Sequence, residues 1–579
     1  MNVPILPLVF REGPMIHRTL GVLGLLLAAT QTAFGIEWRN DPVPPLTGDE
    51  AAFIEDGLDD KEVETLLAAF VDRAEKAYTG RARMPEGFLE WLAGQPALRT
   101  AFWLALVPGA DDPIAAVRVL DTLRREDAEA VETYFHLAVA ISVVWDAPRN
   151  VMMSQRICIF GVGPDQFSKP PGYLWTFRYF TEKKRQRSFL FKIEDLVWPI
   201  AVYIANFDVS EEESEWALRR MGRYRNSVGS TYAMVEYDHG KRNGQSTKLG
   251  SRPYTLANLL EYGGVCGDQA HFCSRVAKCL GIPAMKASGL SRYGGAGHAF
   301  VCYFVWKKRR PILESTGRYF NDFYYTGNVF DPQIGTRILD RTVAMMLDGA
   351  SLSYEKYIQA RTLARIATHV YAQRPEVSLN LAKKAVTTNH FCGTGWRVLM
   401  RHVNEGHVPP EEGLEWGNKM IRYLEDHPDL THECFETFLG CIPREDVKQR
   451  QKFYERVADV YEERPDLQLL LREAQGKELI EAGKEKDALR VLLKACAEHG
   501  KEGRLIMPLI TPAVEILDRE KKYVIAFSRP LDKMIMRFPK RRMNRISASF
   551  QDLARMIIPL YEAVGKQRDA DKLRRRAGL

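Results

Sequence analysis

A chain of 579 residues is too long for one ordinary hydrophobic core, so its length predicts two to four domains. Hydrophobic residues make up 46% of the chain and charged residues 27%, values typical of globular proteins that exclude wholesale disorder. The net charge of +7 is small for this length. Two short basic runs stand out: the one at 307–310 is expected in a turn, and the one at 539–542 at a helix end or in a loop. The charge therefore argues against nucleic-acid binding.

The N-terminus has the layout of a secretory signal peptide. His17 and Arg18 precede an apolar stretch over 20–29, and small residues lead up to Gly35, after which cleavage is expected. Residues 1–14 fit this layout poorly, which leaves Met15 as an alternative start. The apolar stretch is short for a membrane span, and no other segment is longer, so membrane attachment is expected only if the signal stays uncleaved. We therefore expect an exported protein, periplasmic or extracellular, with a signal peptide over 1–35.

After the signal, an N-terminal region at 36–195 is expected to be helical, because apolar residues recur at three- and four-residue steps over much of 48–146. Within the next region, 196–350, Ser210 followed by Glu213 is typical of a helix start. Two short helices are then expected, at 255–262 and 266–281, followed by antiparallel strands at 298–306 and from 311. The sequence thus predicts an α+β core between two helical regions.

The last region, 351–579, is expected to be a stack of helices. Residues 474–499 resemble a tetratricopeptide repeat, and 379–390 and 560–573 look like weaker copies at irregular spacing. The small and large packing positions of the motif are matched by Gly476, Leu479, Ala488, Leu492 and Ala495. A stack of this kind leaves a concave face that can bind a protein partner; the alternative is a helical domain that only packs on the core.

Nine cysteines in an exported chain raise the question of disulfides, but the number is odd and the spacing irregular. No CxxC, HExxH or glycine-rich phosphate loop occurs, so the sequence predicts neither a metal site nor a cofactor. Several cysteines lie within apolar helical or strand patterns, where a buried free thiol is common. These are Cys273, Cys279, Cys302, Cys434 and Cys496.

Cys266 differs from these because it follows Gly263 and Gly264 directly at an expected helix start. The unpaired N–H groups and positive dipole end of a helix N-terminus make a thiol more acidic. The same N–H groups can bind the oxyanion of a tetrahedral intermediate. Asp268 is expected to act as a first-turn acid and His271 as an ordinary face residue of this helix. Cys266 is therefore the candidate nucleophile.

A cysteine nucleophile needs a basic partner, and that base needs a group to orient it. His298 opens the first expected strand, again behind glycines. Glu314, sixteen residues on, is expected to lie level with it on the second strand, completing a catalytic triad. Asp322 and Asp331 are the alternative acids in the less regular segment beyond.

Three segments together resemble the core of the transglutaminase-like superfamily: "ANLLEYGGVCGDQAHFCSRVAKCLGIPAMKASG", "GHAFVCYF" and "ILESTGRY". The order Cys, His, acid and the spacing match over about 232–349. The resemblance implies a papain-like cysteine site on an α+β fold, with Cys266 as nucleophile and His298 as its partner. Glu314 stands where the family usually has aspartate. The family's helper for the oxyanion hole is matched by one of three tyrosines, Tyr232, Tyr254 or Tyr262.

These observations predict a cysteine enzyme that acts on amide bonds of a protein or peptide substrate through a thioester. Water would make it a peptidase or amidase, and an amine would make it a crosslinking acyltransferase. A different class remains open: an inactive relative that serves as a scaffold and binds a protein partner through its C-terminal helices.

Overall fold

The computed structural model describes residues 46, 54, 58–80, 83–289, 297–307, 310–318, 325–542 and 545–579. It is mostly helical, with one five-stranded antiparallel sheet, and this confirms the expected α+β class. The signal segment and Met15 lie outside these residues. In the described part, no helix combines the length and the apolar character that a membrane span requires.

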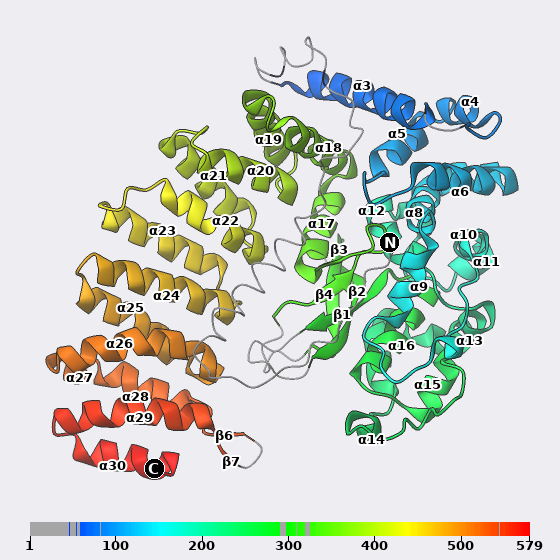
Figure 1. The fold of residues 1–579 in the computed structure, drawn as a ribbon. Coiled ribbons are helices and arrows are strands. Elements are labelled where there is room, and N and C mark those ends of the chain that lie inside the picture. Colours follow the sequence, from blue (N-terminus) through cyan, green and yellow to red (C-terminus); the bar gives the residue numbers. More distant parts are fainter. Residues whose placement is uncertain are drawn as a thin grey trace, which may run out of the picture.

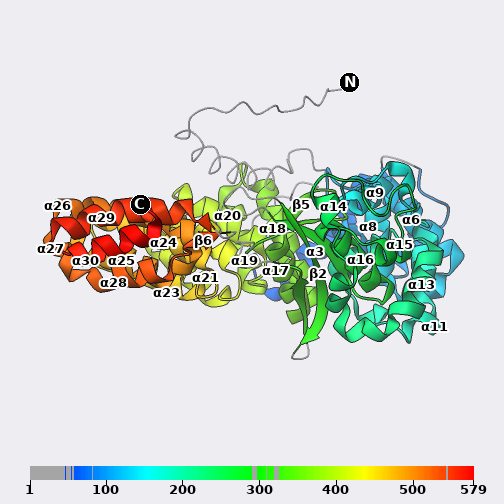
Figure 2. The same ribbon diagram turned by 90° about the horizontal axis from the view of Figure 1, so that it is seen from below.

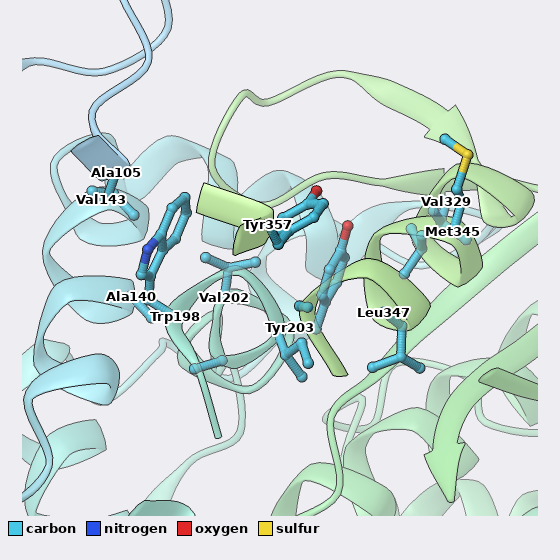
Figure 3. Packing of buried hydrophobic residues seen from close by; sticks show 14 of the residues in the cluster. Ala105, Ala140, Val143, Trp198, Val202, Tyr203, Val329, Met345, Leu347 and Tyr357 are labelled. Carbon is cyan, nitrogen blue, oxygen red and sulfur yellow. The ribbon is translucent and has the colours of Figure 1, made fainter. Parts of the chain in front are cut away.

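The N-terminal helices pack around two apolar ones, α8 and α12, whose residues are nearly all buried. Figure 3 shows side chains of α12 meeting those of α8, α17 and α18, so the helical regions before and after the sheet share one core. The helices up to the sheet are α3 (Asp60–Thr79), α4 (Phe88–Ala93), α5 (Pro96–Ala105), α6 (Pro113–Glu126), α7 (Ala128–Thr133), α8 (Phe135–Trp145), α9 (Pro148–Arg156), α10 (Tyr173–Thr181), α11 (Lys183–Gln186), α12 (Trp198–Ala205), α13 (Glu211–Met221), the 3₁₀ segment η5 (Gly222–Met234), α14 (His239–Arg242), α15 (Leu256–Tyr262) and α16 (Cys266–Cys279).

Local signals place several of these helix starts. Ser210 caps α13 by accepting a hydrogen bond from the backbone N–H of Glu213 at 3.3 Å, as its spacing predicts. Gly263 ends α15 with a φ of +78°, and a Cβ there would lie 2.5 Å from the carbonyl oxygen of Glu236. Glycine is therefore required at this position, directly before the helix that Cys266 begins.

The sheet has the order β3-β2-β1-β4-β5 and is antiparallel throughout. Its strands are β1 (Ala284–Gly289), β2 (His298–Lys307), β3 (Arg310–Thr316), β4 (Asn328–Phe330) and β5 (Arg337–Leu339). Figure 2 shows it between α16 on one side and α17 on the other. Lys286 on β1 faces α16, since its Nζ lies 3.4 Å from Nδ1 of His271. Phe304 on β2 faces the opposite way, with its ring 6.1 Å from that of Tyr203.

The C-terminal helices follow one another as a curved stack (Figure 1). Several begin at a proline, whose missing N–H costs nothing in the first turn. They are α17 (Asp340–Leu352), α18 (Tyr354–Val370), α19 (Pro375–Thr388), α20 (Gly393–Asn404), α21 (Pro410–Tyr423), α22 (Pro428–Gly440), α23 (Val447–Val460), α24 (Pro465–Glu481), α25 (Glu485–Glu498), α26 (Met507–Arg519), α27 (Lys522–Ala526), α28 (Ser528–Arg537), α29 (Ala548–Ala563) and α30 (Gln567–Ala577), with a hairpin of β6 (Arg541–Arg542) and β7 (Arg545–Ile546) before α29.

Two hydrophobic cores run through the molecule, one from Ile54 to Leu471 and one from Leu469 to Ala577. The first core extends across both expected domain boundaries, at 195 and 350. In the stack, α24 and α25 form a helical hairpin, and a Cβ on Gly476 would lie 2.5 Å from Leu492. The two positions thus pack on each other as small and large partners; the tetratricopeptide relationship itself stays a prediction.

Candidate active site around Cys266

Cys266 is the first residue of α16, as its sequence context predicts. Its side chain is partly exposed, whereas Cys273 and Cys279 further along the same helix are fully buried. The prediction that Cys302, Cys434 and Cys496 are buried is also confirmed, and all nine cysteines are free thiols. Of the nine, Cys266 alone combines partial exposure with a helix N-terminus.

Asp268 caps the first turn of α16, and its side chain is buried. Its carboxylate accepts hydrogen bonds from the backbone N–H of Val265 at 2.7 Å, from Lys241 Nζ at 2.9 Å and from the Tyr254 hydroxyl at 2.7 Å. The prediction that it is a first-turn acid is therefore confirmed. Because Tyr254 donates its proton to this buried carboxylate, its hydroxyl is already committed and is a poor candidate for the oxyanion hole.

A turn after α9 lies across the start of α16. Cys158 in this turn has a φ of +64°, the only positive value of a non-glycine residue in the described part. A Cβ added to Gly267 would lie 3.0 Å from the carbonyl carbon of Cys158 and closer still to its oxygen. The glycine after Cys266 is thus required by this contact. Burial raises the pKa of the Cys158 thiol, and Lys286, Ser288 and Cys266 are among its electrostatic neighbours.

Behind the turn, charged side chains of α16 and β1 are buried. Burial lowers the pKa of His271 and of Lys286 well below their ordinary values. Lys286 donates to the carbonyl oxygen of Gln155 at 2.7 Å and so ties β1 to the end of α9. Arg275 pairs with Asp208, and both side chains are almost fully buried. His271 is thus an interior residue of the helix, facing the sheet.

His298 opens β2 and is 7% exposed. Its Nε2 bonds the carbonyl oxygen of Gly317. A carbonyl can only accept, so Nε2 carries the proton, and Nδ1 is the basic nitrogen of the neutral ring. Strand alternation places the imidazole on the same side of β2 as Phe300, while Val301 faces α16 with its partner Lys286. A contact between imidazole and thiol therefore has to pass around the N-terminal end of β2.

Tyr232 contacts two backbone segments beside His298, at Ala299 and at Gly317. Its hydroxyl donates to the carbonyl oxygen of Ala299 at 2.9 Å, and its ring lies against Gly317. Gly317 has a φ of +84°, and a Cβ there would overlap that ring, with 2.7 Å to its Cε2. The third tyrosine, Tyr262, stacks with the guanidinium of Arg252, whose Cζ is 4.4 Å from the ring centre.

The expectation that Glu314 lies level with His298 is wrong. In the register of β2 and β3, Glu314 pairs with Tyr303, five residues from His298 and on the other side of the strand. Its carboxylate forms an ion pair with Lys307 near the hairpin turn. The reason is the turn: Lys307 pairs with Arg310, whereas a partner sixteen residues from His298 would need a turn centred on residue 306.

Neither alternative acid, Asp322 or Asp331, is seen to orient His298 in the described part of the chain. Asp322 lies outside the described residues. Asp331 is fixed in its own turn, where its carboxylate accepts from the backbone N–H groups of Gln333 at 2.9 Å and Ile334 at 3.1 Å. The role expected of an acid is filled, at Nε2 of His298, by the Gly317 carbonyl. Cys158 and Gly317 were missed by the sequence reasoning, and only the turn-rich composition of the segment after α9 pointed to the first.

No family model matches this chain, and no curated protein is significantly similar to it. Within the described ranges, no three His, Cys, Asp or Glu side chains gather in a way that could hold a metal ion.

Proposed function

We propose that the chain is an exported cysteine enzyme with a transglutaminase-like core that acts on amide bonds. The observation that carries the proposal is the position of Cys266, a partly exposed thiol at the first residue of a helix. The order helix, β1, β2, β3 and the antiparallel pairing of the strands agree with that core. His298 on β2 has its ring oriented by the carbonyl oxygen of Gly317, to which Nε2 donates.

The proposed reaction requires the imidazole of His298 to reach the thiol around the N-terminal end of β2, because the strand places it on the side away from α16. His298 Nδ1 then takes the thiol proton, and Cys266 Sγ attacks the amide carbonyl carbon. The oxyanion that forms accepts a hydrogen bond from the backbone N–H of Cys266, which has no acceptor within the helix. The imidazolium then gives its proton to the departing amine, and the C–N bond breaks to leave a thioester. Water releases a carboxylic acid from this thioester, and a primary amine releases a new amide.

The test measures alkylation of Cys266 by iodoacetamide between about pH 5 and pH 9, with the modified peptide identified by mass spectrometry. A thiol without a partner has a pKa of about 8.5, so an activated one reacts far faster at pH 6. We expect His298→Gln to slow alkylation by about tenfold at pH 6 and to have little effect at pH 9. Cys441→Ser, which removes a partly exposed thiol in the helical stack, is the matched control.

Equal rates in the wild-type protein and His298→Gln across this pH range contradict the proposal and favour the inactive scaffold. If the thiol is activated, incorporation of an added fluorescent primary amine into the peptide distinguishes transfer from hydrolysis, because the original amine or ammonia is released in both reactions when the thioester forms.

A further inference from the structure

A cluster of exposed apolar side chains lies in the nine residues from Met152 to Phe160. Met152 is 47% exposed, Met153 is 51% exposed and Phe160 is 72% exposed. Large hydrophobic side chains with this exposure are few in the described part, and three of them fall in this one segment. We call these three residues the apolar lip. Most exposed apolar side chains of folded proteins are scattered singly, so three within one short segment make that segment a candidate binding surface.

The lip is tied to the first turn of α16 on both sides of Phe160. On one side, the Cys158 carbonyl lies against Gly267, the residue after the candidate nucleophile. On the other side, a Cβ on Gly161 would lie 4.0 Å from Cε of Lys241, and the ammonium group of Lys241 bonds Asp268 at 2.9 Å. Any molecule that covers Phe160 therefore lies next to the start of α16.

Two arginines lie on the same helix as the two methionines of the apolar lip. Arg149 and Arg156 are exposed on α9, at helical spacing from Met152 and Met153, so the outer face of the helix alternates arginine and methionine. Neither arginine forms an ion pair with a described carboxylate, although Arg149 is an electrostatic neighbour of Asp146. Arg156 lies over the ring of Phe167, with Cζ 5.7 Å from its centre. The charge of this face is complementary to an acidic residue.

We propose that the apolar lip receives an apolar side chain of a peptide substrate, beside the amide that Cys266 attacks, and that Arg149 and Arg156 receive an acidic residue next to it. This inference rests on the proposed function, because the occupant is a substrate only if Cys266 reacts with it. The methionines suit the role, since their flexible side chains adapt to different apolar partners. The substrate class is thus a peptide with an acidic residue beside a leucine-like one.

The experiment compares two peptidyl chloromethyl ketones, acetyl-Glu-Leu and acetyl-Glu-Gly, with iodoacetamide as a small electrophile without side chains. The rate of Cys266 alkylation is measured in the wild-type protein, in Phe160→Ser and in the double variant Met152→Ser, Met153→Ser. Met536→Ser, which changes a methionine that is 63% exposed on α28, is the matched control. These side chains are exposed, so the variants are expected to fold.

In the wild-type protein and the control, we expect the leucine reagent to react at least about tenfold faster than the glycine reagent. Phe160→Ser should reduce this ratio to about one or two, with an unchanged iodoacetamide rate. If both lip variants keep the wild-type ratio of the leucine rate to the glycine rate and Cys266 still reacts, the apolar lip is not a substrate subsite, while the proposed function stands. Inertness of Cys266 to all three reagents overturns both.

A membrane surface is the competing occupant, because it too binds apolar and basic side chains together. Cosedimentation with phosphatidylglycerol vesicles tests it. Binding that is lost in Phe160→Ser, together with an unchanged leucine-to-glycine ratio, would assign the lip to a membrane and overturn the peptide subsite.

Discussion

The close approach of the Cys158 carbonyl to Gly267 makes Gly267→Ala the most informative single substitution. The new methyl carbon would lie 3.0 Å from the carbonyl carbon of Cys158 and closer to its oxygen, whereas an ordinary C···O contact needs about 3.3–3.6 Å. The obstacle is backbone, held by the left-handed turn at Cys158, and cannot rotate away like a side chain. The turn or the start of α16 therefore has to move.

Two opposing effects set the magnitude. Overpacking of this kind costs about 1–3 kcal/mol. Alanine is favoured over glycine inside a helix by about 1 kcal/mol, which offsets part of that cost, although position 267 is in the first turn, where the gain is smaller. We expect Gly267→Ala to lower the free energy of unfolding by about 2 kcal/mol. Because the displaced turn lies beside Cys266, alkylation of its thiol by iodoacetamide should change as well.

Gly222→Ala is the matched control. Gly222 has helical dihedral angles, with φ −51° and ψ −33°, and no atom lies within 4 Å of a Cβ built on it. This variant should be neutral or more stable by up to about 1 kcal/mol. Urea unfolding followed by circular dichroism measures both. The close contact between the Cys158 carbonyl and Gly267 would be refuted if the two variants were equally stable and Gly267→Ala kept the wild-type rate of Cys266 alkylation.

Three further predictions concern single residues. Glu314→Gln should leave the alkylation rate of Cys266 within about twofold of wild type at pH 6, because Glu314 pairs with Tyr303 rather than with His298; a tenfold loss would restore it as the orienting acid. Cys158→Gly should raise the free energy of unfolding by about 1 kcal/mol, since glycine adopts the left-handed conformation without strain, and a loss of stability in urea would contradict this. Burial raises the pKa of Asp146 to about 7, above its value of 3.8 in the unfolded chain, so the folded protein binds the extra proton and loses stability as the pH rises from about 4 to 7. Asp146→Asn should therefore be more stable than wild type by about 2 kcal/mol at pH 8 and nearly equal at pH 4, and thermal denaturation at the two values checks the sign.

Local features of the core could be predicted because short-range signals determine them. Gly263 and Gly264 mark the start of α16, and the helix begins at Cys266 as expected, although it ends at Cys279 rather than at 281. The strand predicted over 298–306 is β2, and the one from 311 is β3. Glycine conformations, capping and β-branched content act within a few residues of the chain, so a single sequence contains them.

The position of the acid was expected from its spacing to His298 alone, whereas it depends on the register that the hairpin sets. A shift of the turn by two to three residues moves Glu314 from His298 to Tyr303 and reverses the side of the strand on which it lies. The predicted strands, at 298–306 and from 311 with the basic run at 307–310 between them, already imply that Lys307 pairs with Arg310, so the register of the strands was the usable signal and the count of sixteen residues was not. The contact between Cys158 and Gly267 could not be predicted, because it joins residues more than a hundred positions apart.

The carbonyl at Nε2 of His298 has a chemical consequence for the proposed reaction. A carboxylate there would stabilise the imidazolium form by its full charge, whereas the Gly317 carbonyl offers only a dipole. The thiolate of Cys266 must then rely more on the helix N-terminus and less on an ion pair with the imidazolium. Tyr232 links the two segments, because its hydroxyl donates to the carbonyl oxygen of Ala299 and its ring contacts Gly317. Orientation of the ring thus comes from neutral groups, and these keep their hydrogen-bonding capacity at acidic pH values that protonate an aspartate.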